Sequence, residues 1–298
     1  MNVTPELFFN FLIAGIMIGT LYALMAMGIT FIYSIMKMIN WAMGEFYMIG
    51  SYVMWFMVTF ILGSKLWYMG LVAAAVILFI IGLVVQWLLI RPMFSTSMER
   101  KDEYGTVVTI ALSLFLRNLA TVLSGPNTRS PDIDLGRIMI GGLPVSGNRF
   151  AAFIGALIVI GVFYYILNYT WLGRAFRASS QNRVGIQTVG INVLRIDQIA
   201  FALGVTLAGL AGALLASVFN VFPENGAVTT MKGFEIIIIG GMGSLPGAVI
   251  GGLLLGIIES MGSVFIDTGL RNVYGFLFLI MVLLSRPTGL FGEKERLS

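Results

Sequence analysis

The stretch that decides the fold is residues 195–219, which read RIDQIAFALGVTLAGLAGALLASVF, with no charge after Asp197. A helix of about 20 apolar residues spans the hydrocarbon core of a bilayer. Lipid offers the backbone no hydrogen-bond partners, so a spanning segment must be a helix or part of a closed barrel. The alternating pattern of barrel strands is absent. Residues 195–219 therefore predict a transmembrane helix.

One face of this predicted helix carries only small residues. They recur every four positions, as Ala200, Gly204, Ala208, Gly212 and Ala216. Similar series occur elsewhere in the chain, as Ala248, Gly252, Gly256 and Ser260, and as Gly15, Gly19 and Ala23. Small residues let helix backbones approach closely, which stabilises helix pairs in lipid. We expect Gly204, Ala208, Gly212, Gly252 and Gly256 to pack in a bundle core; a moving or subunit-forming surface is the alternative.

The rest of the chain has the same character. Of its 298 residues 58% are hydrophobic and 11% are charged, against about 25% charged in soluble domains. This excludes a water-soluble enzyme and a disordered chain. Eight apolar segments are predicted, at about 7–33, 40–62, 66–90, 104–123, 150–169, 195–219, 234–259 and 272–286. We predict an all-α polytopic membrane protein, a single transmembrane domain over residues 1–298 with seven or eight crossings.

The residue types that are missing exclude whole classes of chemistry. There is no cysteine and no histidine, so disulfides, thiol nucleophiles, histidine bases and the usual zinc or haem ligands are excluded. We expect no cofactor, no metal site and no catalytic residue. The net charge of +4 is small and gives no support for a nucleic-acid partner.

Basic residues predict the orientation, because they collect in cytoplasmic connections. Connections 91–103 and 171–194 are the most basic, which places them inside and the N-terminus outside. Connection 124–149 then lies outside. Segment 234–259 has two short apolar halves, and it is predicted either to cross or to re-enter on one side. The halves are split by Gly240, Gly241, Gly243, Pro246 and Gly247. Re-entry would bring the tail, with Arg286, Lys294 and Arg296, into the cytoplasm.

Four charged residues lie within or close to apolar segments: Glu45, Arg117, Glu235 and Glu259. Such groups are costly in a membrane and are functional candidates by default. Glu235 and Glu259 are interpreted as structural residues that reach the interface, and Arg117 as snorkelling or pairing with a carboxylate. Glu45, which follows Asn40 and Gly44, is predicted either to cap a new helix or to line a substrate path.

Connection 171–194 is predicted to contain a short helix outside the bilayer. Ser179 or Ser180 is expected to cap it, Gly190 to end it and Asn192 to form a further turn. Such a helix between two spans moves both neighbours when it is pushed. A solvated loop that only sets the topology is the alternative.

Four blocks of sequence carry a family resemblance: INWAMGEFYMIGSY (39–52), GRAFRASSQNRVGIQTVGIN (173–192), FALGVTLAGLAGALL (201–215) and GGMGSLPGAVIGGLLLG (240–256). In this order they resemble LivH-type permeases of branched-chain amino acid ABC importers. The resemblance implies a multi-pass permease subunit of a bacterial or archaeal cytoplasmic (inner) membrane. It implies three kinds of partner: a second permease of LivM type, two cytoplasmic ATPases and a periplasmic or extracellular substrate-binding protein. The chain has no phosphate-binding G-x-x-x-x-G-K-[ST] loop of its own.

By this resemblance residues 171–194 form the loop that contacts the ATPases. The family pattern there is Glu-Ala-Ala, three residues, then Gly. Gly190 holds the glycine position, but residues 184–186 read Val-Gly-Ile, so no carboxylate contact is expected. Arg177 and Arg183 are predicted to supply polar contacts instead. The candidate residues of this coupling loop are Arg177, Arg183, Gly190 and Asn192.

The resulting hypothesis is a permease that forms half of a translocation path. Helix breaks at Gly44 and at Gly241 to Gly247 are predicted to expose free backbone groups to this path. Its candidate residues are Asn40, Gly44, Glu45, Gly241, Gly243 and Ser244. The binding protein is expected to dock on 124–149. The solute stays open between branched-chain amino acids and urea or short-chain amides. An ion-coupled secondary transporter, a channel and, last, an intramembrane enzyme are the other classes.

Overall fold

The computed structural model describes residues 5–95, 100–265 and 267–292. In this part the chain is almost entirely helical. The longer helices are α1 (Pro5–Met36), α2 (Met43–Phe56), α3 (Trp67–Val85), α5 (Lys101–Ser124), α6 (Gly147–Tyr169), α7 (Trp171–Gln181), α9 (Val193–Leu215), α10 (Asn225–Gly240), α11 (Leu245–Phe265) and α12 (Arg271–Ser285). The short elements are η1 (Met57–Leu62), η2 (Ser64–Leu66), η3 (Gln86–Ile90), α4 (Arg91–Ser95), β1 (Arg137–Ile140), β2 (Leu143–Ser146), α8 (Gly185–Thr188) and η4 (Thr268–Leu270). Seven continuous helical stretches of the described chain are long and apolar enough to cross a bilayer.

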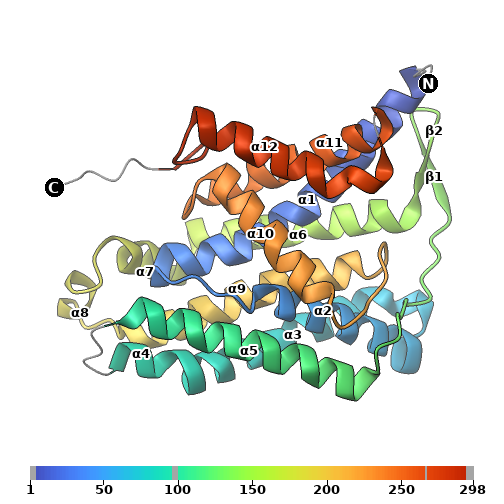
Figure 1. The fold of residues 1–298 in the computed structure, drawn as a ribbon. Coiled ribbons are helices and arrows are strands. Elements are labelled where there is room, and N and C mark those ends of the chain that lie inside the picture. Colours follow the sequence, from blue (N-terminus) through green and yellow to red (C-terminus); the bar gives the residue numbers. More distant parts are fainter. Residues whose placement is uncertain (1–4, 96–99, 266, 293–298) are drawn as a thin grey trace.

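The long helices run side by side, so the bundle has two ends (Figure 1). The α7–α8 end holds α7, α8 and α4. The opposite end, the hairpin end, holds the β1–β2 hairpin and the start of α1. The C-terminal part of the described chain lies at the α7–α8 end, where Leu290 and Phe291 donate to the carbonyls of Ile239 and Gly240. The first and last described residues, Pro5 and Gly292, therefore lie at opposite ends of the bundle, which requires an odd number of crossings between them.

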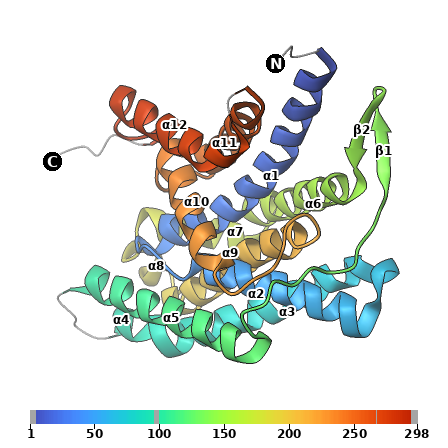
Figure 2. The same cartoon turned by 45° about the vertical axis from the view of Figure 1, so that its right-hand side comes forward.

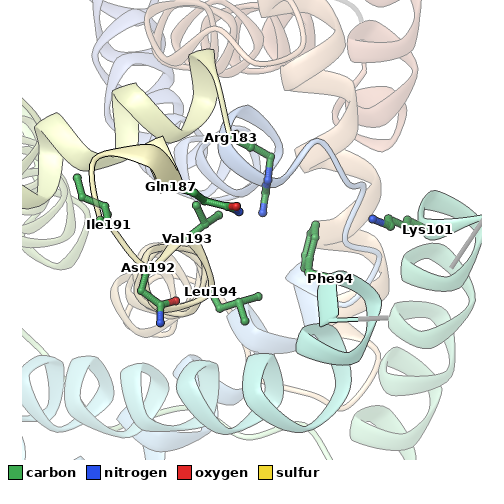
Figure 3. A pocket seen from close by; sticks show the side chains of 9 residues that line it. Phe94, Lys101, Arg183, Gln187, Ile191, Asn192, Val193 and Leu194 are labelled. Carbon is green, nitrogen blue, oxygen red and sulfur yellow. The ribbon is translucent and has the colours of Figure 1, made fainter. Parts of the chain in front are cut away.

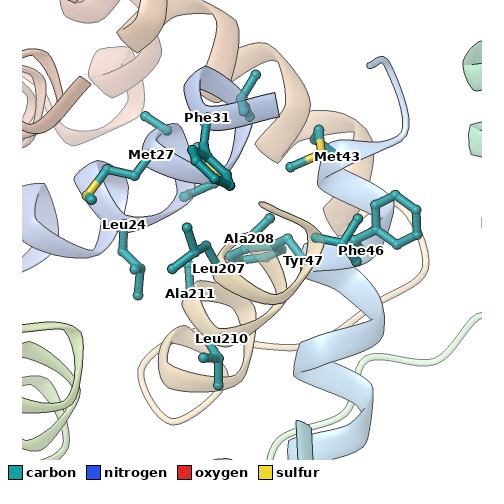
Figure 4. Packing of buried hydrophobic residues seen from close by; sticks show 14 of the residues in the cluster. Leu24, Met27, Phe31, Met43, Phe46, Tyr47, Leu207, Ala208, Leu210 and Ala211 are labelled. Atoms are coloured by element: carbon teal, nitrogen blue, oxygen red, sulfur yellow. The ribbon is translucent and has the colours of Figure 1, made fainter. Parts of the chain in front are cut away.

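Helices α1 and α9 form the centre of the bundle. In Figure 2, α5 lies on one side of them and α11 and α12 on the other. Of the apolar stretch of α9, 78% is buried, against 11% for α5. Figure 4 shows where α1, α2 and α9 meet, with Phe31, Phe46 and Leu207 among the buried side chains. The outer helices α3, α5, α6 and α12 instead expose large apolar residues, as a protein surrounded by lipid does.

The small-residue faces explain why α1 and α9 are central. A Cβ built on Gly204 would lie 2.9 Å from the carbonyl oxygen of Gly28, and one on Gly212 would lie 2.0 Å from that of Tyr47. Gly252 and Gly256 lie equally close to the α1 backbone, at Ala23 and Gly19, and Ala208 is fully buried beside Gly28. The small residues on α9 and α11 therefore pack within this chain.

The predicted split of segment 234–259 is confirmed, and its two halves are separate helices. Helix α10 ends at Gly240, the chain reverses over Gly241–Ser244, and α11 begins at Leu245. Gly241 and Gly243 have φ angles of +100° and +86°, a backbone conformation that glycine adopts at low cost. Because α10 starts at Asn225, it lengthens the predicted segment by nine residues, and α11 continues beyond it to Phe265.

The connection predicted at 124–149 contains the only strands of the described residues. β1 and β2 pair antiparallel, with Arg137 opposite Ser146 and Ile140 opposite Leu143. Gly141 and Gly142 form the turn with positive φ angles, as a two-residue hairpin turn requires. Before the hairpin, Arg129 pairs through its backbone with Val221, so the connection is held to the α9–α10 connection.

Candidate functional site

The predicted loop 171–194 folds as two short helices. The expected cap at Ser179 or Ser180 is wrong, because α7 begins earlier, at Trp171, and the Thr170 hydroxyl accepts from the amide of Gly173. Ser179 is buried inside α7. The side chain of Asn182 then accepts from the amides of Val184 and Gly185 and starts α8. Gly190, with a φ angle of +80°, lies two residues beyond α8.

Arg183 fixes this loop to the two central helices. Its guanidinium donates to the Asp197 carboxylate on α9 and, at 3.1 Å, to the carbonyl oxygen of Ile35 on α1. It also lies 4.6 Å from the ring centre of Phe94. The Asp197 side chain is fully buried, and a buried carboxylate is stable only when paired. Arg183 is therefore engaged within the chain, while 30% of its side chain stays exposed; its contact with an ATPase stays a prediction.

A cavity of about 510 Å³ adjoins Arg183 at the α7–α8 end. Figure 3 shows Gln187 and Val193 on one side of it and Phe94 and Lys101 on the other. The outward-facing residues of the loop are different ones. Arg177 is exposed, and Val184 and Val189 are 74% and 72% exposed. Asn192 is also exposed, and its side-chain oxygen caps α9 by accepting from the amide of Arg195.

The first helix break was predicted at Gly44, but the chain leaves the helix earlier, at residues 37–42 between α1 and α2. Asn40 is buried, and its side-chain oxygen accepts from the amide of Ala42 at 2.9 Å. Gly44 lies inside the first turn of α2, where its amide donates to the Thr230 hydroxyl at 3.1 Å. A Cβ on Gly44 would come within 1.9 Å of the carbonyl oxygen of Gly226. Gly44 thus lies where α2 and α10 cross closely, and its backbone amide is already hydrogen-bonded to Thr230.

Glu45 is not a helix cap. Its carboxylate accepts from the Ser113 hydroxyl at 2.9 Å and from the Arg117 guanidinium at 3.3 Å, both on α5. The expected pairing of Arg117 with a carboxylate is confirmed. This fully buried glutamate is thus one polar attachment of α5 to the bundle; another is the Thr109 hydroxyl, which accepts from the amide of Trp41. Its second oxygen has no hydrogen-bond partner among the described residues.

The second helix break was predicted at Gly241 to Gly247, and part of its backbone is hydrogen-bonded. The amide of Ser244 donates to the carbonyl of Gly241, and the Ser244 hydroxyl accepts from the amide of Gly247 at 3.1 Å. Gly292 lies against Gly241, and residues 290–291 bond to the carbonyls that end α10. Met242, in the middle of this turn, is 39% exposed, so the exposure of free backbone groups to a path stays a prediction here. The C-terminal segment covers this turn; Lys294 and Arg296 lie outside the described residues.

The structure contains a buried ion cluster that the sequence analysis missed. Lys232 on α10 contacts Glu259 on α11 and lies 3.4 Å from Glu235. Arg271, at the start of α12, lies 2.9 Å from the other Glu259 oxygen, which also accepts from the Tyr22 hydroxyl at 3.1 Å. Glu235 and Glu259 are 2% and 0% exposed. They do not reach the interface as expected, because α10 and α11 turn them toward each other.

A cavity of about 350 Å³ lies beside this cluster, toward the hairpin end. Its charged lining consists of Lys232 and Arg271, and hydroxyl and carboxamide groups surround them. Its apolar lining comes from α1, α9, α10 and the α9–α10 connection. The lining residues are Tyr22, Met25, Tyr47, Leu215, Phe219, Asn220, Phe222, Asn225, Val228, Thr229, Lys232, Arg271 and Asn272.

One signal in the sequence points to this cluster. Lys232 and Glu235 are spaced three apart, which places them on one face of a helix, at the beginning of an apolar run. The contributions of Tyr22 and Arg271 carry no such signal, because they arise only from the packing of α1 and α12. Among the described residues no group of histidine, cysteine, aspartate and glutamate side chains is arranged to hold a metal ion.

Comparison with known proteins gives one consistent result. The family model described as branched-chain amino acid transport system / permease component matches residues 11–285. The chain is 36% identical to the high-affinity branched-chain amino acid transport system permease protein LivH of Salmonella typhimurium, over 94% of each chain. It is 33% identical to the permease protein BraD of Pseudomonas aeruginosa, over 95% of each chain. It is 22% identical to the permease protein LivM of Salmonella typhimurium, over 91% of this chain and 67% of LivM. No solved structure matches.

Proposed function

We propose a function on one premise: the chain belongs to the family of permease components of branched-chain amino acid transport systems. It is a multi-pass membrane permease subunit. Its solute is a branched-chain amino acid, which it passes through a path formed with a second permease of LivM type. ATP is hydrolysed by two separate cytoplasmic subunits, and a binding protein delivers the solute from outside. The membrane is the inner, cytoplasmic membrane.

The similarity to LivH over 94% of both chains carries this proposal. It favours a branched-chain amino acid over urea or a short-chain amide, the other solutes that the sequence left open. An ATP-driven importer also differs from an ion-coupled carrier in what the isolated permease can do: without its ATPases it does not transport. Purified chain in vesicles with an ion gradient should give no leucine uptake, whereas the assembled complex with ATP should. Gradient-driven uptake by the chain alone would contradict the proposal.

The α7–α8 end is the cytoplasmic end in this proposal, and residues 171–194 form the coupling loop. The supporting observation is the attachment of Arg183 to α9 and α1 at once. Since these are the two central helices, an ATPase that displaces the loop displaces the middle of the bundle with it. The exposed valines at 184 and 189 offer apolar contact area at an end that faces water.

Replacing Val189 by glutamate is expected to release the ATPases. A charge in the centre of an apolar contact is desolvated without a partner, which costs far more than the lost contact alone. We expect capture of the ATPase subunits by the purified permease to fall at least about tenfold, since 1.4 kcal/mol corresponds to a factor of ten. Thermal unfolding of the permease itself should not change, because Val189 is 72% exposed. Unchanged ATPase capture would refute the coupling role of the loop.

The matched variant is Met139→Glu, at the opposite end. Met139 on β1 is 69% exposed, and in this proposal the β1–β2 hairpin contacts the binding protein. This variant should retain ATPase capture but lose stimulation of ATP hydrolysis by the liganded binding protein. The two variants therefore have reciprocal defects. Loss of ATPase capture in Met139→Glu would contradict the assignment of the α7–α8 end to the cytoplasm.

A further inference from the structure

We propose that the cavity beside Lys232 and Arg271 is a binding subsite for the transported amino acid, with the carboxylate held by these two cations. This inference rests on the proposed function and adds to it the place of the solute. The cavity lies among α1, α9, α10 and α12. Its volume of about 350 Å³ is at the small end of the range for small-molecule sites.

The cations that line the cavity keep free hydrogen-bond donors. Arg271 uses its Nε toward Glu259 and one Nη2 bond toward Tyr22. A guanidinium has five N–H bonds, so the two on Nη1 are not used in the hydrogen bonds of the described residues. Lys232 contacts Glu235 and Glu259, which leaves one of its three N–H bonds. Both side chains remain partly accessible, at 29% and 11% exposure.

The glutamates stand behind the cations and do not line the cavity. They hold Lys232 and Arg271 in place and lower the cost of keeping two positive charges inside a membrane protein. The cavity surface itself then offers positive donors without an opposing carboxylate. This arrangement selects an anionic group on the ligand.

The remaining lining fits the rest of an amphiphilic amino acid. Met25, Leu215 and Phe222 supply apolar surface for a branched aliphatic side chain. Side-chain oxygens of Asn225, Thr229 and Tyr47 also line the cavity, and such oxygens accept hydrogen bonds from an ammonium group. A neutral polar solute such as urea would use neither the apolar surface nor the charge.

The position of the cavity suits delivery from outside. Leu215 ends α9, whose other end at Val193 adjoins the coupling loop. At 1.5 Å per residue these two points are about 33 Å apart, close to the thickness of the hydrocarbon core. The subsite therefore lies at the outer end of the path, where a solute released by a binding protein arrives first.

The absence of native cysteine allows a direct test by single-cysteine labelling. Val228 lines the cavity and is 54% exposed. In the assembled complex with binding protein, leucine is expected to slow the reaction of the Val228→Cys variant with a small thiol reagent at least fivefold. Ser64→Cys, at an exposed position between α2 and α3 that lies outside the cavity and outside connection 124–149, is the control and should react at the same rate with and without leucine.

A second substitution separates binding from folding. Adding Arg271→Gln to the Val228→Cys variant should raise the leucine concentration needed for protection at least tenfold, because a charged hydrogen bond to the carboxylate is lost. The matched control is Arg117→Gln. Its side chain is 31% exposed and also pairs with a fully buried glutamate, but it lies outside the cavity. It should leave the protecting concentration unchanged, even where it lowers the unfolding temperature.

The outcomes distinguish this inference from the proposed function. If the wild-type complex transports leucine but leucine does not slow labelling of Val228→Cys, the subsite is refuted and the function stands. The same holds if protection is unaffected by Arg271→Gln, or is weakened equally by Arg117→Gln. If the wild-type complex does not transport leucine at all, both fail.

Discussion

Replacing Gly212 by leucine is expected to abolish folding of the permease. A Cβ at this position would lie 2.0 Å from the carbonyl oxygen of Tyr47 and 2.8 Å from its carbonyl carbon. These are backbone atoms of α2, so no side-chain rotation relieves the clash, and α2 and α9 must separate. Overpacking usually costs about 1–3 kcal/mol where side chains can adjust; here we expect more. The measurement is the yield of monodisperse protein after detergent extraction, which should fall to background.

The control for this prediction is Gly161→Leu. Gly161 lies in the middle of α6, and a Cβ there would meet nothing within 4 Å. The same change of residue in another membrane helix should therefore leave the yield unchanged. Gly212→Ala should lie between the two, because a single methyl group already overlaps the α2 backbone. Normal yield of Gly212→Leu would show that α2 and α9 do not pack as closely as described.

Replacing Glu259 by alanine is expected to destabilise the packing of α1, α10, α11 and α12. Glu259 is fully buried and is the shared acceptor of Lys232, Arg271 and Tyr22. Without it Lys232 retains Glu235, but Arg271 loses its carboxylate partner. Removing one partner of a buried ion pair costs about 3–5 kcal/mol; we expect about 3 kcal/mol, because the Arg271 side chain is 29% exposed. At roughly 2–4 °C per kcal/mol for chains of 150–250 residues, the unfolding temperature should fall by at least about 5 °C.

The comparison variant is Glu103→Gln. Glu103 also pairs with an arginine, Arg100, at 3.2 Å, but both side chains are more than 60% exposed. Exposed pairs contribute about 0–1 kcal/mol, so its unfolding temperature should change little. Equal shifts in the two variants, measured by tryptophan fluorescence in the same detergent, would show that burial of the Glu259 cluster does not stabilise the bundle.

Much of the fold follows from local patterns in the chain. Apolar length predicts where α1, α3, α5, α6, α9 and α12 lie to within a few residues, because only the bilayer thickness has to be matched. The four-residue spacing of small residues on α9 predicts its close packing. The glycines at 241 and 243 predict a break in segment 234–259. They do not predict that α10 begins as early as Asn225. The connection before it is held by a contact distant in sequence, the backbone pairing of Val221 with Arg129.

The site was much less predictable. Arg117 was expected to snorkel or to pair with a carboxylate. Its partner is Glu45, and this pairing depends on α5 lying beside α2. Arg183 was expected to face an ATPase, whereas its partner Asp197 is fourteen residues later and meets it only when the coupling loop folds back. Tyr22 and Glu259 form a hydrogen bond across 237 positions of sequence. No periodicity relates two such residues.

The sequence by itself determined that this protein lives in a membrane, where its helices lie, and the family to which it belongs, because these depend on composition, segment length and residue order. Only the tertiary structure decided which charges share a site. In lipid each buried ion needs a partner, and that partner comes from whichever helix packs alongside. The pairings of Lys232, Arg271 and Glu259, and the cavity beside them, therefore belong to the packed bundle and not to any one segment.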